Sequence, residues 1–280
     1  MGDGLLVVCA TPIGNLGDVT LRVLDALRDA DVIEAEDTRV TRRLLARHGI
    51  TTRLEPYHAR NLVRRTPEVV ARVEAGQRVA LVSDAGTPGV SDPGAHLVDA
   101  CLEAGLPVEV LPGPSAILTA LVASGLPTHA FYFGGFLPRK RGEIRKALEA
   151  VGGLDATLVF YESPRRAAAS LAVMAQVMPG RRAALARELT KLFEEVERGD
   201  VADLAQRYAG CELKGEVVLL VGPPSRDAPA EPLEEEALLA AVDALVSGGT
   251  SRSEAVRAVA KERGVRRNAL YAIVTSRDRA

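Results

Sequence analysis

Cysteine and aromatic residues are scarce in this chain of 280 residues, which has three cysteines, no tryptophan, and aromatic residues at 4% of its positions. Cys9, Cys101 and Cys211 are too far apart to form a metal-binding CxxC pattern. We therefore expect no metal site, and the low cysteine content fits a reducing cytoplasm. The shortage of aromatic side chains counts against an apolar pocket for a flat macrocyclic ligand.

Long apolar runs and the common phosphate-binding motifs are also missing. The longest apolar stretches, at 5–10 and 116–126, are shorter than the roughly 20 residues that a membrane helix needs. No basic segment precedes the first of them, so we expect neither a signal peptide nor a membrane partner. Neither GxGxxG nor GxxxxGKS/T occurs at the turns, which disfavours a dinucleotide or a P-loop triphosphate.

Charge is balanced overall but uneven along the chain. The net charge of −2 excludes a uniformly basic surface, and only five of the 35 basic residues are lysines. Segment 38–65 holds eight arginines against Glu55 alone, segment 139–146 is a second basic cluster, and the tail after Thr250 is a third. Three such clusters in a near-neutral chain favour a polyanionic partner. The eight arginines are Arg39, Arg42, Arg43, Arg47, Arg53, Arg60, Arg64 and Arg65.

Short apolar runs alternate with helical patterns through most of the chain. From 1 to 112 this alternation predicts an α/β domain with a mostly parallel sheet covered on both faces, including a helix over 67–75. A second mixed α/β domain is predicted over 113–222, with no strand between 186 and 201. A proline-rich linker over 223–236 then leads to a small helix-turn-helix-like domain over 237–280, with helical patterns at 234–247, 252–262 and 266–276.

Three loops rich in glycine and proline follow predicted strands, at 11–15, 83–94 and 112–116. Ligands of open α/β sheets bind beyond the carboxyl ends of the strands, where helix N-termini and backbone amides converge. Glycine lets the backbone approach a ligand closely, and proline limits the entropy lost on binding. We expect the three loops to share one crevice that suits a compact, nearly neutral cofactor such as S-adenosylmethionine.

Six short segments carry a family resemblance. Through them the chain resembles the tetrapyrrole-methylase superfamily over about 5–222, and within it the bacterial methyltransferases that modify the ribose 2′-oxygen of a decoding-centre cytidine. AEDTR and ARELTK are the segments most specific to that ribosomal branch, and the tail resembles a helix-turn-helix found in some members. The segments are ATPIGNL (10–16), AEDTR (35–39), SDAGTP (83–88), PGPSA (112–116), FYESP (160–164) and ARELTK (186–191).

The resemblance implies two tandem mixed α/β domains with a cleft between them that binds S-adenosylmethionine. It also implies a homodimer, a substrate in the 16S rRNA of the small ribosomal subunit, and a reaction without a metal. Matching loops imply that the second domain closes the cleft with Phe160 or Tyr161 and the region of Ala186. The cofactor-binding residues implied in the first domain and the loop after it are Pro12, Asp84, Gly86, Thr87, Val90, Ser115 and Ala116.

Methylating a 2′-hydroxyl requires an aligned oxygen and the removal of a proton whose pKa lies far above 7. Polar residues at predicted strand ends are candidates for this role. A lysine could stabilise the developing alkoxide and a carboxylate could accept the proton, although ion pairing among these groups is an equally open interpretation. His58 is a further candidate base, and Asp84 could orient a loop instead of touching a ligand. The predicted catalytic residues are Glu36, Asp37, Arg39, Glu188 and Lys191.

Two other functions remain open at this stage. A small-molecule C-methyltransferase acting on a tetrapyrrole would share the cofactor cleft but would need an apolar macrocycle pocket, and the basic segments argue against it. A non-catalytic RNA-binding module would use the arginines but would leave the three loops unexplained. In the leading interpretation, RNA contacts come mainly from segment 39–65, including Arg42, Arg43, Arg64 and Arg65, and from the tail.

Overall fold

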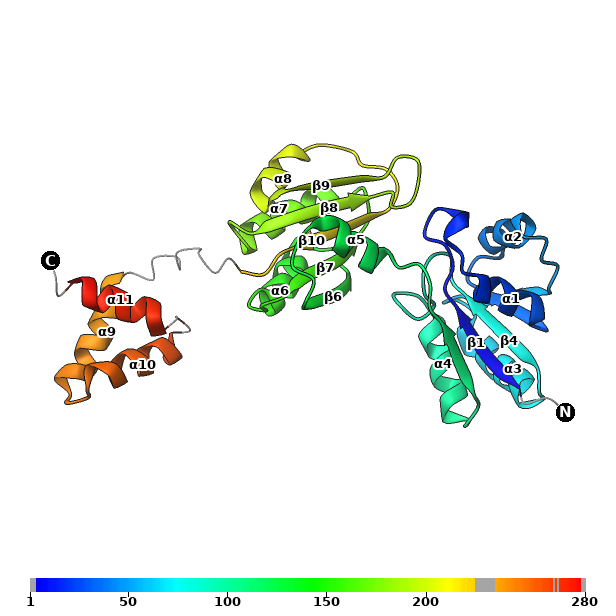
Figure 1. Cartoon of the computed structure of the whole chain (residues 1–280), viewed down its shortest axis with the longest axis horizontal. Coiled ribbons are helices and arrows are strands. Elements are labelled where there is room, and N and C mark those ends of the chain that lie inside the picture. Colours follow the sequence, from blue (N-terminus) through cyan, green and yellow to red (C-terminus); the bar gives the residue numbers. More distant parts are fainter. Residues whose placement is uncertain (1–3, 225–234, 264, 266, 278–280) are drawn as a thin grey trace. The chain divides into compact units, whose positions relative to one another are not determined.

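The computed structural model describes residues 4–224, 235–263, 265 and 267–277. The chain divides into two compact units, Met1–Pro224 and Ser225–Ala280, and each is described here by itself (Figure 1). In the described part of the chain, no helix is both long and apolar enough to cross a bilayer.

The first sheet of the larger unit is parallel throughout, with strand order β3-β2-β4-β1-β5. Its strands are β1 (Leu5–Cys9), β2 (Val32–Ala35), β3 (Leu54–Pro56), β4 (Arg78–Val82) and β5 (Val108–Leu111). Helices α1 (Leu21–Asp29) and α2 (Thr38–Arg47) pack on one face, and α3 (Leu62–Glu74) and α4 (Gly94–Glu103) on the other. All strands point the same way, so the loops that follow them open at one edge.

The second sheet is mixed, with strand order β6-β7-β10-β8-β9. It consists of β6 (Phe131–Phe136), β7 (Thr157–Glu162), β8 (Arg182–Arg187), β9 (Glu195–Asp200) and β10 (Val217–Val221). Only β6 and β7 are parallel neighbours among these described strands. Helices α6 (Arg141–Val151), α7 (Ala167–Val177) and α8 (Val201–Arg207) pack on one face, and α5 (Ala116–Ser124) on the other.

The smaller unit consists of α9 (Glu235–Ser247), α10 (Arg252–Glu262) and α11 (Arg267–Arg277). Apolar side chains from all three helices, among them Val242, Val256 and Leu270, form a separate small core. The predicted helical patterns are confirmed, whereas most of the predicted linker, at 225–234, lies outside the described residues.

Two elements differ from the sequence prediction. Helix α3 begins at Leu62 and contains Pro67, which the sequence suggested as its start. Proline cannot donate to the carbonyl of Val63, but Val63 is 81% exposed, so water can satisfy that carbonyl. Strand β9 was missed because its sequence, EVERGD, lacks apolar alternation, and its pairing with β8 defines it instead.

A buried cluster of charges joins β2, β3 and α3. The guanidinium of Arg65, whose side chain is 8% exposed, is paired with the fully buried Glu34, with Glu55 at 2.6 Å and with Glu68 at 2.7 Å. Burial raises the pKa of Glu34, although its hydrogen bond from Arg65 acts in the opposite direction. The prediction that Arg65 contacts RNA is therefore wrong, because its charge is neutralised inside the protein. The other seven arginines of segment 38–65 are exposed.

The pair Arg64 and Arg65 tests how much this cluster stabilises the fold. Arg65→Met should lower the free energy of unfolding by about 3–5 kcal/mol, since it leaves the buried Glu34 charge without its closest partner. Arg64→Met is the matched control, because the Arg64 side chain is 74% exposed and its pair with Glu68 spans 3.3 Å. It should change stability by less than about 0.5 kcal/mol. Urea unfolding followed by circular dichroism measures both, and equal losses would contradict the assignment.

Candidate functional site

The loops that follow β1 and β4 are joined by backbone hydrogen bonds. The Thr11 amide donates to the Gly86 carbonyl at 2.8 Å, and the Gly86 amide returns a bond to the Thr11 carbonyl at 3.0 Å. The Thr11 hydroxyl donates to the carbonyl of Ser83 at 3.0 Å. Gly86 has φ +81°, a conformation that disfavours other residues. These bonds fix the floor of the predicted crevice.

Carboxylates at the ends of β2 and β4 are linked through the backbone. Asp84 Oδ1 accepts from the amide of Asp37 at 2.9 Å, and Glu36 Oε2 accepts from the amide of Asp84 at 3.4 Å. Burial raises the pKa values of Glu36 and Asp84 above their ordinary range. In contrast, hydrogen bonds from Arg39 lower the pKa of the exposed Asp37 to about 2. Glu36 and Asp84 are therefore better proton acceptors than Asp37.

The loop between β4 and α4 is held by one aspartate. Asp92 Oδ1 accepts from the amides of Gly89 at 2.5 Å and Gly94 at 2.9 Å. Within this loop Gly89 and Ser91 both have positive φ, and Ser91 is one of three described non-glycine residues that do so. Strain of this kind persists where the surroundings enforce it, often at ligand sites.

Aromatic and acidic residues of β7 face this loop from the second α/β half. The ring of Tyr161 lies 4.9 Å from that of Phe133 and 5.4 Å from that of Phe136, measured between centroids. Glu162 is buried and accepts from the Ser170 hydroxyl at 2.5 Å, and it also pairs with Arg166 at 2.5 Å. The carboxylate of Glu162 is thus fixed on the α7 side of the sheet, whereas Tyr161 packs on the α5 side.

A cavity of about 420 Å³, which we call the carboxylate pocket, is lined by residues from both sheets. Five acidic residues line it, and none of its lining residues in the described chain is lysine or arginine. Its size is typical of a small-molecule site. Its acidic residues are Glu36, Asp84, Asp92, Glu162 and Glu216.

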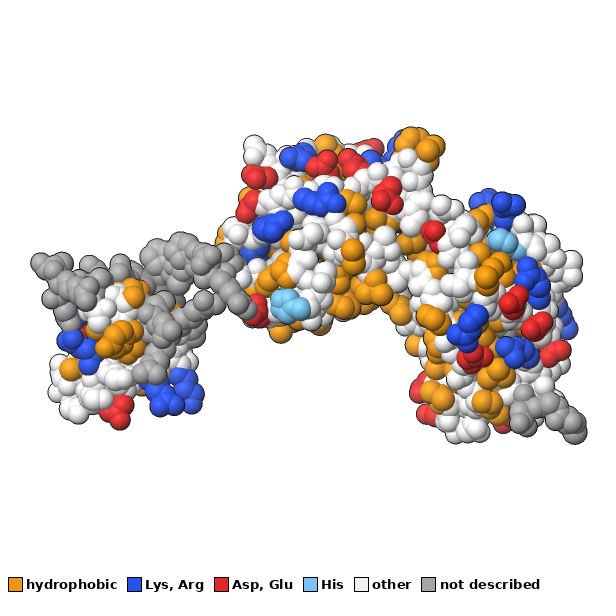
Figure 2. Space-filling view, in the orientation of Figure 1, with side chains coloured by type: hydrophobic (Ala, Val, Ile, Leu, Met, Phe, Trp, Pro, Cys, Tyr) orange, Lys and Arg blue, Asp and Glu red, His pale blue; other side chains and the backbone are white. Residues whose placement is uncertain are grey.

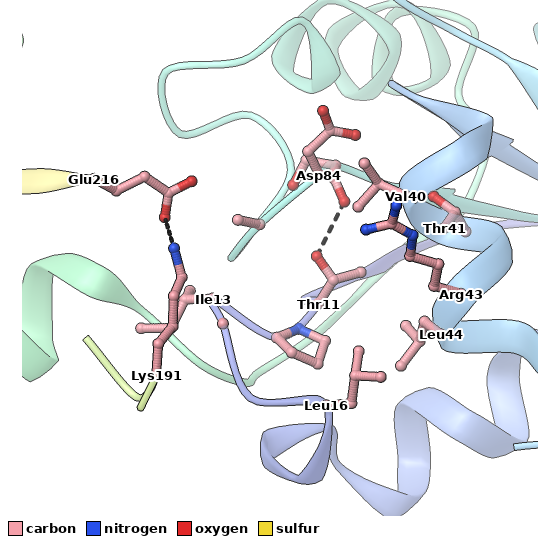
Figure 3. A pocket seen from close by; sticks show the side chains of 14 residues that line it. Thr11, Ile13, Leu16, Val40, Thr41, Arg43, Leu44, Asp84, Lys191 and Glu216 are labelled. Atoms are coloured by element: carbon pink, nitrogen blue, oxygen red, sulfur yellow. Dashed lines mark hydrogen bonds and ion pairs between the residues drawn. The ribbon is translucent and has the colours of Figure 1, made fainter. Parts of the chain in front are cut away.

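An adjoining cavity of about 480 Å³, which we call the lysine pocket, is lined by residues that include two cations. Figure 3 shows Lys191 and Glu216 on one side of it and Arg43, with Val40 and Leu44 of α2, on the other. Ile13, Asp84, Ala85 and Glu216 line both cavities, so the two share a wall. The described lining of the carboxylate pocket has no lysine or arginine, whereas that of the lysine pocket has both cations and carboxylates.

Lys191 is held by carboxylates from two directions. Its ammonium donates to Glu188 at 2.7 Å and to Glu216 at 3.2 Å. Burial opposes its charge, but these hydrogen bonds and the charge of Glu216 leave the pKa of Lys191 raised. Lys191 thus stays protonated at neutral pH.

Two glycines make room for this arrangement. A Cβ at Gly14 would lie 2.5 Å from Lys191 Cγ and 2.9 Å from the Leu189 carbonyl oxygen. A Cβ at Gly215 would lie 2.1 Å from Glu188 Oε1. Gly14 lets the first α/β half approach Lys191, and Gly215 leaves room for the Glu188 carboxylate within the second half.

The structure brings most of the predicted site residues together. Glu36 lines the carboxylate pocket, and Pro12 and Lys191 line the lysine pocket. Asp37, Arg39, Glu188 and His58 line neither. The predicted cofactor-binding residues that line the carboxylate pocket are Asp84, Gly86, Thr87, Val90, Ser115, Ala116 and Tyr161.

Strand alternation separates Phe160 from Tyr161. Phe160 is 3% exposed and packs in the core under α6 and α7, where its ring occupies the space beside Gly134. Ala186 is fully buried against α5 and is absent from the lining of both pockets. Of these three residues, Tyr161 is the one that reaches the cavity.

Several lining residues were not singled out from the sequence. Three of them, Asp92, Glu162 and Ser163, lie in the loop 83–94 or in the segment FYESP, next to residues predicted to bind the cofactor. Their place in the sequence could therefore have indicated them. Glu216 carried no such signal, because it lies at the start of an otherwise apolar strand. Its contact with Lys191, 25 residues away, is set by the fold alone.

Comparison with known proteins agrees with this architecture. Residues 5–205 match the model of the Tetrapyrrole (Corrin/Porphyrin) Methylases, and the chain belongs to this family. It is therefore a methyltransferase, whose reaction requires a methyl donor, and the resemblance inferred from the six segments is confirmed.

Two similar curated proteins carry the name ribosomal RNA small subunit methyltransferase I. The one from Mesorhizobium japonicum is 48% identical over 95% of this chain and 90% of that protein. The one from Escherichia coli O157:H7 is 43% identical over 96% of this chain and 94% of that protein. Among solved structures, uroporphyrin-III-C-methyltransferase from Thermus thermophilus aligns with a TM-score of 0.55 at 25% identity, over 79% of this chain and 92% of that one.

Gly14→Ala tests the close approach at Lys191. The new methyl group should displace the lysine stem and weaken the hydrogen bonds to Glu188 and Glu216, so the pKa of Lys191 should fall toward its ordinary value of 10.5. NMR titration of ¹³C-labelled lysine side chains measures this, since the chain has only five lysines. Gly142→Ala, where a Cβ would meet nothing within 4 Å, is the control. An unchanged Lys191 titration in Gly14→Ala would contradict the predicted displacement.

Proposed function

We propose that this methyltransferase uses S-adenosylmethionine to methylate the ribose 2′-hydroxyl of a cytidine in the decoding centre of 16S rRNA. The relatives named ribosomal RNA small subunit methyltransferase I support the RNA substrate, because they are similar over nearly the whole chain. We further propose that it acts in the cytoplasm on the small ribosomal subunit.

The observation that carries the proposal is the pairing of the two pockets. No described lysine or arginine lines the carboxylate pocket, which disfavours a phosphate-bearing cofactor. Glu162 and Glu216 are paired with Arg166 and Lys191, so Glu36, Asp84 and Asp92 are the carboxylates left to favour a cationic one. The neighbouring site holds Arg43 and Lys191 beside Asp84 and Glu216, and the exposed Arg43 favours an anionic substrate such as an RNA backbone. Asp84 lies where the two meet.

S-adenosylmethionine suits the carboxylate pocket by charge, and the volume of about 420 Å³ is typical of a small-molecule site. When bound, it supplies a methyl group on a positively charged sulfur. Thr87, Val90, Ser115, Ala116 and Tyr161 would hold it, with the carboxylates of the pocket balancing its positive charge. The glycine-rich loop pinned by Asp92 lets backbone groups approach the ligand without an intervening side chain.

The residues of the lysine pocket supply the remaining chemistry. The protonated Lys191 stabilises negative charge that develops on the 2′-oxygen, as preorganised donors do at other oxyanions. Asp84, whose pKa is raised by burial, accepts the proton of the 2′-hydroxyl, and Glu36 supports it through the backbone of Asp84. In this assignment the amide of Asp37 positions Asp84, Arg39 holds Asp37, and Glu188 positions Lys191.

Exposed arginines extend the cationic site over the protein surface. Arg39, Arg43 and Arg47 recur every fourth residue on α2, so they share one face of the helix, and Arg43 reaches the lysine pocket. Arg257 and Lys261 have the same spacing on α10 and are also exposed. We propose that these faces bind phosphates of the rRNA.

A separate apolar surface fits a second copy of the chain. Leu118 and Val122 on α5 and Phe131 on β6 are all exposed. Figure 2 shows hydrophobic side chains gathered over α5 and β6 in the second α/β half. These three residues line neither pocket. We propose that they form the homodimer interface.

Neither alternative explains both pockets. A tetrapyrrole C-methyltransferase needs an apolar macrocycle site, whereas the cavity beside the carboxylate pocket contains Arg43 and Lys191. A non-catalytic RNA-binding module leaves the carboxylate pocket without a purpose, and the chain belongs to a family of methylases.

The direct test is transfer of labelled methyl from S-adenosylmethionine to small ribosomal subunits that lack the modification. Nuclease mapping should find one labelled cytidine in the decoding centre, and its 3′ phosphodiester should resist alkali because the 2′-oxygen is blocked. Thr87→Trp should abolish transfer by filling the carboxylate pocket. Thr51→Trp, at an exposed position outside both pockets, should stay active. Label in a base, or no label in the subunit RNA, would refute the proposal.

Lys191→Gln tests the charge proposed for the transition state. It should lower kcat about 10²- to 10³-fold, as loss of an oxyanion donor does, while the dissociation constant of S-adenosylmethionine measured by calorimetry stays within about 2-fold. Lys140→Gln, whose side chain is 83% exposed on the second half, should leave both unchanged. A variant that lost cofactor affinity instead of kcat would assign Lys191 to cofactor binding.

A further inference from the structure

The connection between β8 and β9 presents two adjacent apolar side chains to water. Leu192 is 89% exposed and Phe193 is 70% exposed. In the described part of the chain, these are the highest values among large hydrophobic and among aromatic side chains respectively. In the view of Figure 2, hydrophobic side chains gather at the free end of this connection. Neither residue contributes to a core of the protein.

The connection is nevertheless well ordered by its own bonds. The Thr190 amide donates to Glu194 Oε2 at 2.6 Å, and the Lys191 amide donates to the Glu188 carbonyl at 3.0 Å. Glu188 and Thr190 both hold positive φ, at +53° and +64°. A bond from the Asn15 amide to the Thr190 hydroxyl, at 3.1 Å, ties the turn to the first α/β half. A surface fixed in this way loses little entropy when it binds a partner.

The position of the turn relates it to the substrate site. Lys191 lines the lysine pocket, and Leu192 and Phe193 follow it directly in the chain. Arg43 on α2 lines the same pocket. An apolar, aromatic tip therefore adjoins a pocket whose lining includes Arg43 and Lys191 together with Asp84 and Glu216. Polyanions whose charged backbone carries flat apolar groups, as single-stranded RNA does, match this combination.

We propose that Phe193, flanked by Leu192, is a platform on which a nucleobase of the RNA stacks, next to the nucleotide whose ribose enters the lysine pocket. This inference rests on the proposed function and adds a substrate-positioning residue to it. Stacking on Phe193 holds the strand in register while the arginines hold its phosphates.

Three substitutions at one position separate stacking from simple apolar contact. Phe193→Trp keeps an aromatic face, Phe193→Leu keeps apolar area without a ring, and Phe193→Ala removes both. Leu21→Ala, at a position on α1 that is 78% exposed, is the matched surface control. For each full-length variant, initial rates are measured with saturating S-adenosylmethionine and varied amounts of unmethylated small subunits. Subunit affinity is measured at several salt concentrations, cofactor affinity by calorimetry, and mass by sedimentation.

Phe193→Ala should raise the KM for the small subunit by between about 5- and 150-fold, the range expected for loss of one base-stacking contact. The slope of log affinity against log salt should stay unchanged, because no phosphate contact is lost. Phe193→Trp should lie within about 2-fold of the parent, Phe193→Leu should resemble Phe193→Ala, and Leu21→Ala should have no effect. Cofactor affinity and mass should stay the same throughout.

Three results would overturn the platform. Full activity of Phe193→Leu would mean that a ring is not required, and a change of mass in Phe193→Ala would assign the tip to contact between copies of the chain. Parent-like kinetics of Phe193→Ala would mean that the tip does not touch the substrate. In each case a parent protein that still methylates small subunits keeps the proposed function intact, whereas an inactive parent would refute that function.

Discussion

The paired hydrogen bonds between Thr11 and Gly86 are the constraint on which the site depends. They join the loops after β1 and β4, two neighbouring strands of a sheet whose strands all point toward one edge. Once the two loops are joined, Asp84 lies between the carboxylate and lysine pockets, and Gly86 lines the carboxylate pocket together with Ser115 and Ala116. The second α/β half then completes the walls with Tyr161, Lys191 and Glu216. The parallel half thus supplies the floor with Arg43 and three carboxylates, and the mixed half adds Lys191 and Glu216.

Separation of charge over a short path gives the site its chemical character. Carboxylates on one side of Asp84 favour a cation, and Arg43 and Lys191 on the other side favour an anion. The hydrogen bonds to Glu188 and Glu216 fix the ammonium of Lys191, and the missing side chains of Gly14 and Gly215 leave room for this arrangement. Two glycines that line the pockets therefore help to determine where the positive charge lies.

Local patterns in the sequence were sufficient for most of the fold and for part of the site. Buried strands and capped helices repeat at short range, so both α/β sets and the three C-terminal helices could be predicted. Loops rich in glycine and proline indicated a crevice, and the family resemblance implied Thr87, Val90 and Ser115, which line the carboxylate pocket. Two differences from the prediction are local, since α3 begins before Pro67 and strand alternation turns Phe160 into the core. Three others involve long-range contacts. Arg65 read as a surface cation because Glu34, its buried partner, lies 31 residues away, and β9 has no pattern of its own. Likewise, Glu216 enters the site only through the order of strands in the second sheet.

The two borders of that second sheet affect how copies of the protein can meet. At one border β9 presents Glu195, Glu197, Arg198 and Asp200, and at the other β6 is interrupted at Gly134 and Gly135, where its register with β7 shifts. Charged and irregular borders resist the addition of a further strand. Continuous sheets running from one molecule to the next are thus disfavoured, and association is directed to helical faces. The protein can keep exposed apolar side chains for recognition at lower risk of forming fibrous aggregates.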